Sequence, residues 1–176
     1  MNYIPVPAGT NLTNFVNTNV GDMENQGLEV SFNFTPYLTE KNSWDLAINM
    51  GYNQSKITKL IANEDPDYEG ILVGGIASGV GSNIQIHSVG YAPNSFYVYE
   101  QLYNDDGSIL EGEFADRNED GIVNEEDKYR FQKPAADYSL GFTSNLSLGN
   151  FDFSFAGRAN LGNYVYNNVQ TDMGYL

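Results

Sequence analysis

The residues that could do chemistry by type and spacing lie in one stretch, ADRNEDGIVNEED, at positions 115–127. Laid on the twelve positions of an EF-type calcium loop, this stretch places an oxygen donor at every ligand position and Gly121 at the sharp turn. Calcium takes about six to eight oxygens, and alternate residues of a tightly turned loop point inward together. The predicted metal ligands are Asp116, Asn118, Asp120, the carbonyl of Ile122, Asn124 and Asp127.

Two interpretations of this loop remain open at the level of sequence. A run of Asp, Asn and Gly is also typical of ordinary turns, in which Asx hydrogen bonds are sufficient. An Asp instead of a Glu at the twelfth position, Asp127, shortens the reach for a bidentate contact and favours a modest affinity. No amphipathic helix is predicted before the loop and no second loop is paired with it, so a calcium sensor is not expected. We predict a structural calcium that pins a surface loop.

Few residues outside this loop are candidates for catalysis. There is no cysteine and His87 is the only histidine, which excludes a Cys-His catalytic pair and a zinc-binding His/Cys cluster, and His87 itself is interpreted as an ordinary loop or rim residue. Acidic pairs such as Asp105 and Asp106 have the carboxylates of a glycosidase, but their polar loop setting offers no apolar environment to shift a pKa. We therefore predict that the chain is not an enzyme.

Four aromatic residues form a second candidate site, for contact with a substrate or a partner. Aromatic rings in a polar loop stack on sugar faces or grip a protein partner, whereas simple packing of the loop is the alternative reason for them. These residues are Phe96, Tyr97, Tyr99 and Tyr103.

The composition limits which elements can position these residues. The 176 residues carry 23 acidic and 8 basic side chains, a formal charge of −15, which disfavours nucleic acid and anionic lipid headgroups as partners. Aromatic residues make up 14% of the chain and there are 18 glycines, a combination that favours strands and tight turns. No apolar run reaches the roughly 18 residues of a membrane helix, and residues 1–14 lack the features of a signal peptide. An almost wholly β fold is predicted.

Four segments alternate between apolar and polar residues with a period of two, which predicts strands. The apolar rows lapse only at Ser144 and Gly157. The turn sequences PYLTEKNS and Gly149–Asn150 join the strands into two antiparallel hairpins. The predicted strands span residues 28–35, 44–53, 138–148 and 151–161.

The polar rows of these strands indicate which solvent the apolar rows meet. They are mostly Ser, Asn, Thr, Gly and Ala, whereas surface strands of soluble proteins usually carry many Lys and Glu. All four charges, Glu29, Asp45, Asp152 and Arg158, fall on the polar side. This pattern favours the wall of a transmembrane β-barrel, with apolar rows toward outer-membrane lipid and polar rows toward a wet lumen. Periodicity alone leaves a soluble sandwich open.

Residues 60–137 separate the two hairpins and are acidic and rich in Gly, Asn and Asp. We expect a loop-dominated, mainly extracellular region that contains the calcium-type loop at 116–127. Within it, NSFYVYEQLY predicts a strand and EEDKYRF a helical turn.

The segment NVGDMENQGLEVSF, residues 19–32, resembles a strand-start signature of the SusC/RagA-like TonB-dependent transporters of Bacteroidetes outer membranes. Four further stretches follow in the family's order, so the resemblance covers nearly the whole chain, 1–176. They are SWDLAINMGYNQSKITKL, VGYAPNSFYVYE, DRNEDGIVNEED and YSLGFTSNLSLGNFDFSF.

The resemblance implies that the chain is a late segment of such a barrel. Family barrels have about 22 strands and a plug, whereas this sequence shows neither a plug nor a TonB-contacting segment, and four to six strands cannot close a barrel, for which about eight are needed. The implied function is import of oligosaccharides or peptides across the cell outer membrane, energised through TonB, with a SusD-like surface lipoprotein as lid. The alternative is a soluble, calcium-stapled β-domain for adhesion or carbohydrate binding.

Overall fold

The computed structural model describes residues 2–5, 15–18, 21–60, 68–76 and 83–169. The described residues divide into two compact units. We call residues 25–54 and 132–169 the sheet unit, and the described parts of 1–24 and 55–131 the loop unit. The predicted all-β, antiparallel fold is confirmed, because nearly all regular structure in both units is strand.

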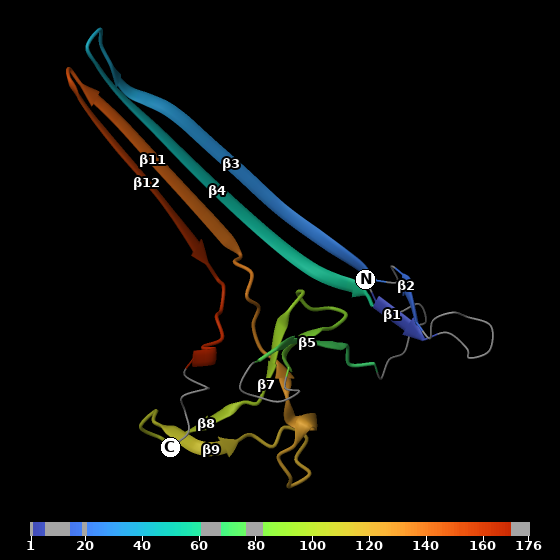
Figure 1. Cartoon of the computed structure of the whole chain (residues 1–176). Coiled ribbons are helices and arrows are strands. Elements are labelled where there is room, and N and C mark those ends of the chain that lie inside the picture. Colours follow the sequence, from blue (N-terminus) through green and yellow to red (C-terminus); the bar gives the residue numbers. More distant parts are fainter. Residues whose placement is uncertain (1, 6–14, 19–20, 61–67, 77–82, 170–176) are drawn as a thin grey trace. The chain divides into compact units, whose positions relative to one another are not determined.

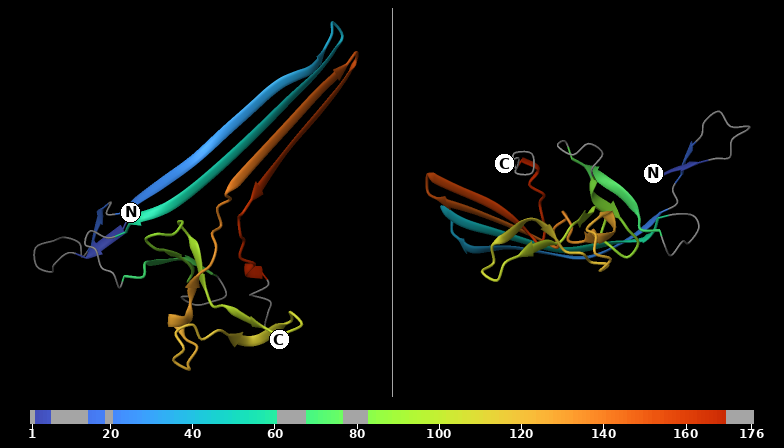
Figure 2. Two further views of the ribbon diagram at one scale, coloured as in Figure 1. Left: turned by 180° about the vertical axis from the view of Figure 1, so that it is seen from behind. Right: turned by 90° about the horizontal axis from the view of Figure 1, so that it is seen from below.

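Four long strands make one open sheet, in the order β12-β11-β4-β3. Figures 1 and 2 show them lying side by side. Their bounds are β3 (Asp22–Leu38), β4 (Asn42–Lys59), β11 (Tyr138–Leu148) and β12 (Phe151–Leu161). The last two match the prediction residue for residue. The first two are longer than predicted, because backbone pairing continues through stretches such as DMENQG and QSKITK, in which the alternation of apolar residues has stopped.

The two hairpin turns are tied to each other. In the first, the backbone N–H of Thr39 donates to the Asn42 carbonyl at 2.7 Å. In the second, Gly149 adopts a φ of +60°, a conformation that glycine takes without strain. The N–H of Gly149 donates to the Lys41 carbonyl at 3.1 Å and to Oδ1 of Asn42 at 2.9 Å. The first turn therefore anchors the second.

The loop unit is built from short strands. Its largest sheet has the order β10-β7-β6-β5, and two further pairs, β1-β2 and β8-β9, stand apart from it. The region predicted as loop-dominated contains six of these strands, each too short to show alternation in the sequence. Their bounds are β1 (Asn2–Pro5), β2 (Phe15–Thr18), β5 (Ile71–Gly75), β6 (Asn83–His87), β7 (Ser95–Val98), β8 (Gln101–Tyr103), β9 (Ile109–Phe114) and β10 (Tyr129–Arg130).

The predicted helical turn is confirmed, whereas the single strand predicted for NSFYVYEQLY is divided into two strands of different sheets. NSFYVYEQLY supplies β7 and β8, and EEDKYRF contains a 3-10 turn at Glu125–Asp127. In the described parts of the chain, no helix has the length and apolar character to cross a membrane.

The core of the loop unit is small and is completed by a polar cluster around Arg130. The buried apolar side chains are Ile57, Leu60, Ile86, Phe96 and Tyr97. The Arg130 guanidinium donates through Nε to Oγ of Ser88 at 2.8 Å and through Nη2 to the Glu69 carbonyl at 2.7 Å. Arg130 thereby joins segments that lie up to 61 residues apart.

Candidate functional site

Strand register sorts the side chains of the sheet into two chemically different faces. Residues directly opposite each other in an antiparallel pair project from the same face. The register places the predicted apolar rows of β4, β11 and β12 in line. The aligned sets are Tyr52/Tyr138/Leu161, Met50/Leu140/Ala159, Ile48/Phe142/Gly157, Leu46/Ser144/Phe155 and Trp44/Leu146/Phe153.

The opposite face carries the predicted polar rows. Most of its side chains are small, and its charges are few. The aligned sets are Gly51/Ser139/Asn160, Asn49/Gly141/Arg158, Ala47/Thr143/Ala156, Asp45/Asn145/Ser154 and Ser43/Ser147/Asp152. The alternation read from single strands is therefore a property of the whole sheet.

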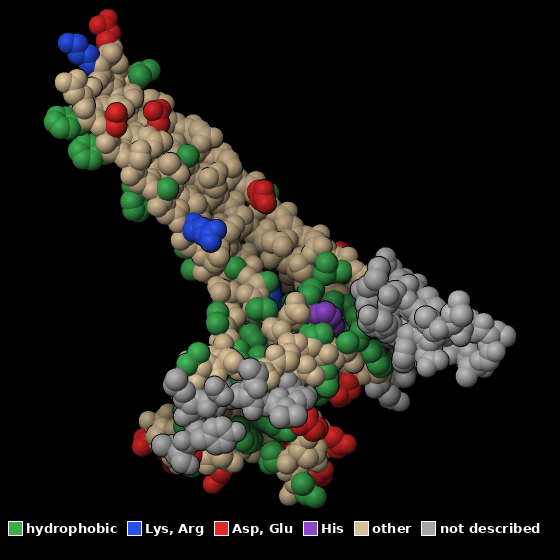
Figure 3. Space-filling view, in the orientation of Figure 1, with side chains coloured by type: hydrophobic (Ala, Val, Ile, Leu, Met, Phe, Trp, Pro, Cys, Tyr) green, Lys and Arg blue, Asp and Glu red, His purple; other side chains and the backbone are tan. Residues whose placement is uncertain are grey.

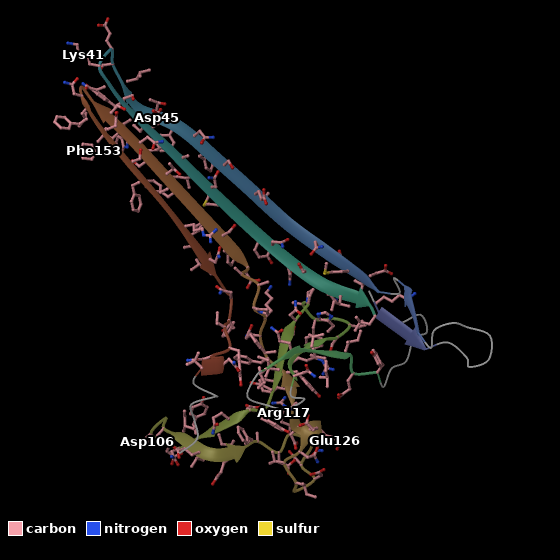
Figure 4. All side chains as sticks on the ribbon, in the orientation of Figure 1. Lys41, Asp45, Asp106, Arg117, Glu126 and Phe153 are labelled. Carbon is pink, nitrogen blue, oxygen red and sulfur yellow. The ribbon has the colours of Figure 1, made fainter. Side chains whose placement is uncertain are left out.

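The apolar face is uncovered. No residue of β3, β11 or β12 is buried. Many large side chains of the apolar face are exposed, with exposed fractions from 37% for Trp44 to 68% for Phe151. In Figure 4, Phe153 projects outward at the flank of the sheet. A soluble domain of the predicted alternative type would pack these rows into its interior, and the described residues contain no such packing.

The lapse at Ser144 has a local reason that the sequence did not reveal. Nε1 of Trp44 donates a hydrogen bond to Oγ of Ser144 at 3.0 Å. Ser144 lies opposite Leu46 and Phe155, within the apolar face. A buried or lipid-exposed N–H without a partner costs several kcal/mol, roughly. The serine satisfies the indole N–H at a place where the other aligned side chains, Leu46, Leu146, Phe153 and Phe155, offer no acceptor.

The lapse at Gly157 is covered by a neighbouring ring. A Cβ at Gly157 would lie 3.6 Å from two ring carbons of Phe155. The Phe155 ring also packs against Phe142, with ring centroids 6.1 Å apart. Coverage of a strand glycine by an aromatic ring keeps the apolar surface continuous.

Aromatic residues mark both ends of the apolar face. Tyr52 and Tyr138 are register partners with ring centroids 5.2 Å apart, and Trp44 lies near the opposite, turn end. β11 has 11 residues, which at roughly 3.3 Å each cover about 35 Å along the strand. At the ~40° tilt of barrel strands this spans about 27 Å, close to the ~25 Å height of the apolar band of outer-membrane barrels.

Carboxylates on the polar face are held by neighbouring hydroxyls. Oγ1 of Thr35 donates to Oδ1 of Asp45 at 2.6 Å. Oγ of Ser147 donates to Oδ1 of Asp152 at 2.6 Å. A charged carboxylate with such partners is compatible with a wet lumen and incompatible with hydrocarbon.

A glycine in the predicted strand-start signature is required by close packing. A Cβ at Gly27 would lie 2.7 Å from the carbonyl oxygen of Tyr52, a contact that real Cβ atoms essentially never make. The sequence NQGLEVSF therefore needs glycine where β3 lies against β4.

The predicted calcium loop is tightly turned, as expected. Oδ2 of Asp116 accepts the N–H of Gly121 at 2.7 Å, and Oδ1 of Asp120 accepts the N–H of Ile122 at 2.8 Å. Glu119 and Gly121 adopt φ values of +60° and +87°. These contacts turn the chain back on itself within six residues of Asp116, whether or not a cation is bound.

Asp127, the predicted twelfth ligand, is fully buried and accepts three backbone N–H groups. The donors are Asn124 at 2.7 Å, Arg117 at 2.7 Å and Asn118 at 3.3 Å. These hydrogen bonds, that of Asn124 above all, hold the pKa of the Asp127 carboxyl below its usual value. Asp127 and Asn124 also form a capping box around the 3-10 turn. Both residues organise the loop from within.

The metal itself stays a prediction. Among the described residues, no three His, Cys, Asp or Glu side chains are grouped so that they could hold a metal ion. The predicted set relies in part on Asn118, Asn124 and a carbonyl. Nδ2 of Asn118 donates to Oδ2 of Asp120 at 3.1 Å and to Oε2 of Glu126 at 3.4 Å. Glu126, which the twelve-position pattern does not include, therefore lies beside the predicted ligands.

The four predicted contact aromatics separate into buried and surface residues. Phe96 and Tyr97 are only 6% and 5% exposed and pack in the core. Burial, together with a hydrogen bond to Glu69, raises the pKa of Tyr97 to about 12. Tyr99 is half-buried against Phe114, with ring centroids 5.4 Å apart. Of the four, Tyr103 alone presents most of its side chain to solvent.

Two cation and aromatic pairs hold the calcium-type loop to its surroundings. Arg117 forms an ion pair with Glu100 and lies over the Tyr129 ring, 4.5 Å from its centroid. Lys128 pairs with Glu125 at 2.6 Å and lies 5.1 Å from the centroid of the Tyr99 ring. These contacts anchor both ends of the loop.

No protein-family model matches the chain. It is 44% identical over 166 residues to the TonB-dependent receptor SusC of Bacteroides thetaiotaomicron, covering 94% of this chain and 17% of that protein. It is 29% identical over 156 residues to a TonB-dependent receptor of Formosa agariphila, covering 85% of this chain and 16% of the relative. The chain thus spans about a sixth of the relatives it matches.

Solved structures show the same fold. The RagAB peptide importer in its closed-closed state matches with a TM-score of 0.58 at 20% identity, over 85% of this chain and 16% of that one. A second structure of the RagAB peptide transporter matches with a TM-score of 0.55 at 23% identity, over 87% and 16%.

Fold and comparisons define a class: the chain corresponds to a segment of the β-barrel of a TonB-dependent receptor. Within that class, the predicted resemblance to SusC/RagA-like receptors is confirmed. These relatives are named as receptors and transporters rather than enzymes, in agreement with the prediction that the chain is not an enzyme.

Proposed function

We propose that the chain forms part of the wall and the extracellular loops of a larger outer-membrane transporter, which we call the parent transporter. It imports oligosaccharides or peptides, is energised through TonB, and works with a SusD-like surface lipoprotein as lid. In this proposal the sheet unit belongs to the barrel wall, residues 60–137 are mainly extracellular, and the chain's own residues shape the lumen and the loop surface.

The separation of the sheet into two faces carries the proposal. One face is apolar, continuous and exposed, and the other bears small polar side chains and hydrogen-bonded carboxylates. Hydrocarbon on one side and water on the other satisfies both faces at once. The relative named SusC and the structures named as peptide importer and transporter support the transport role.

Fractionation and uptake test the proposal. The parent transporter should stay with the outer membrane after carbonate washing and should need detergent for extraction. Cells that carry it should accumulate a labelled oligosaccharide or peptide, and loss of TonB should abolish the accumulation. A parent protein that remains soluble in buffer as a stable monomer would instead support the soluble β-domain.

We also propose that calcium binds the loop at 116–127 as a structural staple. Asp116, Asn118, Asp120 and the Ile122 carbonyl supply oxygens at the turn, and Glu126 is an additional carboxylate beside them. At present the side-chain amide Nδ2 of Asn118 bridges the carboxylates of Asp120 and Glu126. A bound calcium would replace this amide as the group that holds the two carboxylates together.

Limited proteolysis of the parent transporter tests the staple. Excess calcium should slow cleavage within the loop, and magnesium should do so less, because it demands a smaller octahedral site. The Asp120→Ala variant removes a ligand oxygen and should lose the calcium effect. Equal cleavage rates with calcium and with chelator in the wild type would contradict the staple.

A further inference from the structure

The β8-β9 hairpin of the loop unit stands apart as a two-stranded ribbon. An isolated ribbon of this kind is marginally stable in water, yet this one is anchored at its base. The N–H of Ala115 donates to the Glu100 carbonyl at 2.9 Å, and the Phe114 ring packs on Tyr99. Nε2 of Gln101 also lies within hydrogen-bond distance of three backbone carbonyls of the hairpin. The ribbon is fixed at one end and projects at the other.

The projecting tip is a closed, rigid turn. The N–H of Asn104 donates to the Ser108 carbonyl at 2.8 Å, and the N–H of Gly107 donates to the Asn104 carbonyl at 2.9 Å. Oδ1 of Asp106 accepts both the N–H of Ser108, at 2.9 Å, and its hydroxyl, at 2.6 Å. These hydrogen bonds lower the pKa of the Asp106 carboxyl. A turn that is ordered in advance loses little conformational entropy when it binds.

This rigid tip presents two large apolar side chains on one side. Tyr103 and Ile109 are register partners and therefore share a face of the ribbon. They are 59% and 57% exposed. An aromatic and an aliphatic side chain held together on a pre-ordered turn have the character of a binding hot spot.

Carboxylates also lie on the turn and along β9. Asp105, Asp106, Glu111 and Glu113 are all exposed, and none forms an ion pair with a basic side chain in the described part of the chain. In Figure 3, acidic side chains gather around the lower end of the loop unit, and Figure 4 places Asp106 at the hairpin. An apolar centre with a charged rim is the ordinary anatomy of a protein interface.

We infer that the tip of the β8-β9 hairpin docks into the SusD-like lipoprotein, in an apolar pocket whose rim carries Lys or Arg. This inference rests on the proposed function, which supplies the partner. Charge complementarity decides the chemistry of that partner, because four uncompensated carboxylates repel an acidic surface and attract a basic one. The aliphatic Ile109 favours a protein pocket over a sugar, whose hydroxyls it cannot pair.

Binding between the purified parent transporter and its SusD-like lipoprotein tests the inference. The double substitution Tyr103→Ala with Ile109→Ala should raise Kd about ten-fold or more, mainly by faster dissociation. A second variant, Tyr103→Thr with Ile109→Thr, keeps strand propensity while it removes the apolar surface, and it should have the same effect.

The charged rim predicts a separate kinetic effect. Glu111→Gln with Glu113→Gln leaves the turn hydrogen bonds in place and should slow association a few-fold at low salt, with a weaker salt dependence. As a matched control, Leu72→Ala with Val89→Ala removes two apolar side chains of similar exposure elsewhere in the loop unit. This control should leave Kd within about two-fold of the wild type.

The binding results separate failure of the docking inference from failure of the proposed function. A complex whose Kd is unchanged in both Tyr103/Ile109 double variants overturns the docking inference alone. A loss of thermal stability in these variants without a change in Kd means that another part of the parent transporter covers the tip, and it also overturns the inference. A wild-type transporter that binds no SusD-like lipoprotein overturns the inference together with the partner in the proposed function.

Discussion

The sheet unit and the loop unit differ in where they place their large apolar side chains and in which contacts keep them ordered. The sheet unit leaves its large apolar side chains exposed on one face and keeps its order through strand register. The loop unit buries a few apolar side chains and relies on individual polar contacts, such as those of Arg130 and Asp127. Under the proposed function the difference corresponds to two solvents: hydrocarbon against the sheet, and water around the loops.

The largest expected effect comes from placing a charge on the apolar face of the sheet. Phe142→Arg in the parent transporter should destabilise the folded barrel by about 2–4 kcal/mol, the cost of arginine near a bilayer midplane. Thr143→Arg, one residue along on the polar face, should cost much less. Denaturant titration of the transporter folded into vesicles measures both. Equal losses of folding stability in the two variants would contradict the assignment of the two faces to different environments.

Close packing inside the sheet gives the next effect. Gly27→Val places side-chain carbon 2.7 Å from the Tyr52 carbonyl oxygen and should cost roughly 1–3 kcal/mol of folding stability. Gly141→Ala is the matched control, because its Cβ would meet only ordinary contacts at 3.6 Å. The same denaturant titration applies. A harmless Gly27→Val would mean that β3 shifts freely relative to β4.

The loop unit is sensitive to the protonation of Asp127. Its carboxyl has a lowered pKa when folded, so its stabilising contribution is present above the ordinary pKa of Asp and is lost as the pH falls through the folded value. Asp127→Asn should speed amide exchange of Arg117, Asn118 and Asn124 at neutral pH and flatten the acid dependence of that exchange. Hydrogen exchange followed by mass spectrometry measures both. Unchanged exchange would show that the loop does not depend on this carboxylate.

The smallest effect concerns the hydrogen bond between Trp44 and Ser144 on the apolar face. Trp44→Phe removes the indole N–H that bonds to Ser144 and should cost about 0.5–1 kcal/mol. A double-mutant cycle with Ser144→Ala measures the coupling free energy between Trp44 and Ser144. A coupling energy of zero would mean that lipid or water satisfies the indole equally well.

Sequence periodicity predicted the sheet because one physical rule, alternation between an apolar and a polar face, acts on every residue of a strand. It placed β11 and β12 at their observed bounds and assigned Asp45 and Asp152 to the polar face. It missed the extensions of β3 and β4, where backbone pairing continues without alternation. The partner of Trp44 was also invisible, because that contact joins residues 100 positions apart.

The loop unit was harder to predict because its order comes from contacts between distant residues. The sequence predicted Phe96 and Tyr97 as contact aromatics, but both lie in β7, between β6 and β10 in the sheet, and both are buried. The calcium-type pattern predicted the turn at Gly121 correctly. It gave no signal for Glu126, which reaches Asn118 only after the chain has folded back at the 3-10 turn.

The link between the two hairpin turns has a mechanical consequence. In the proposed barrel wall, a slip of either hairpin by one residue would turn its phenylalanines and leucines toward the lumen and its serines and asparagines toward hydrocarbon. Such a slip would also pull Gly149 away from Lys41 and Asn42, which lie on the neighbouring hairpin. The two hydrogen bonds of Gly149 therefore fix the register of one hairpin against the other at the turn end of the four-stranded sheet.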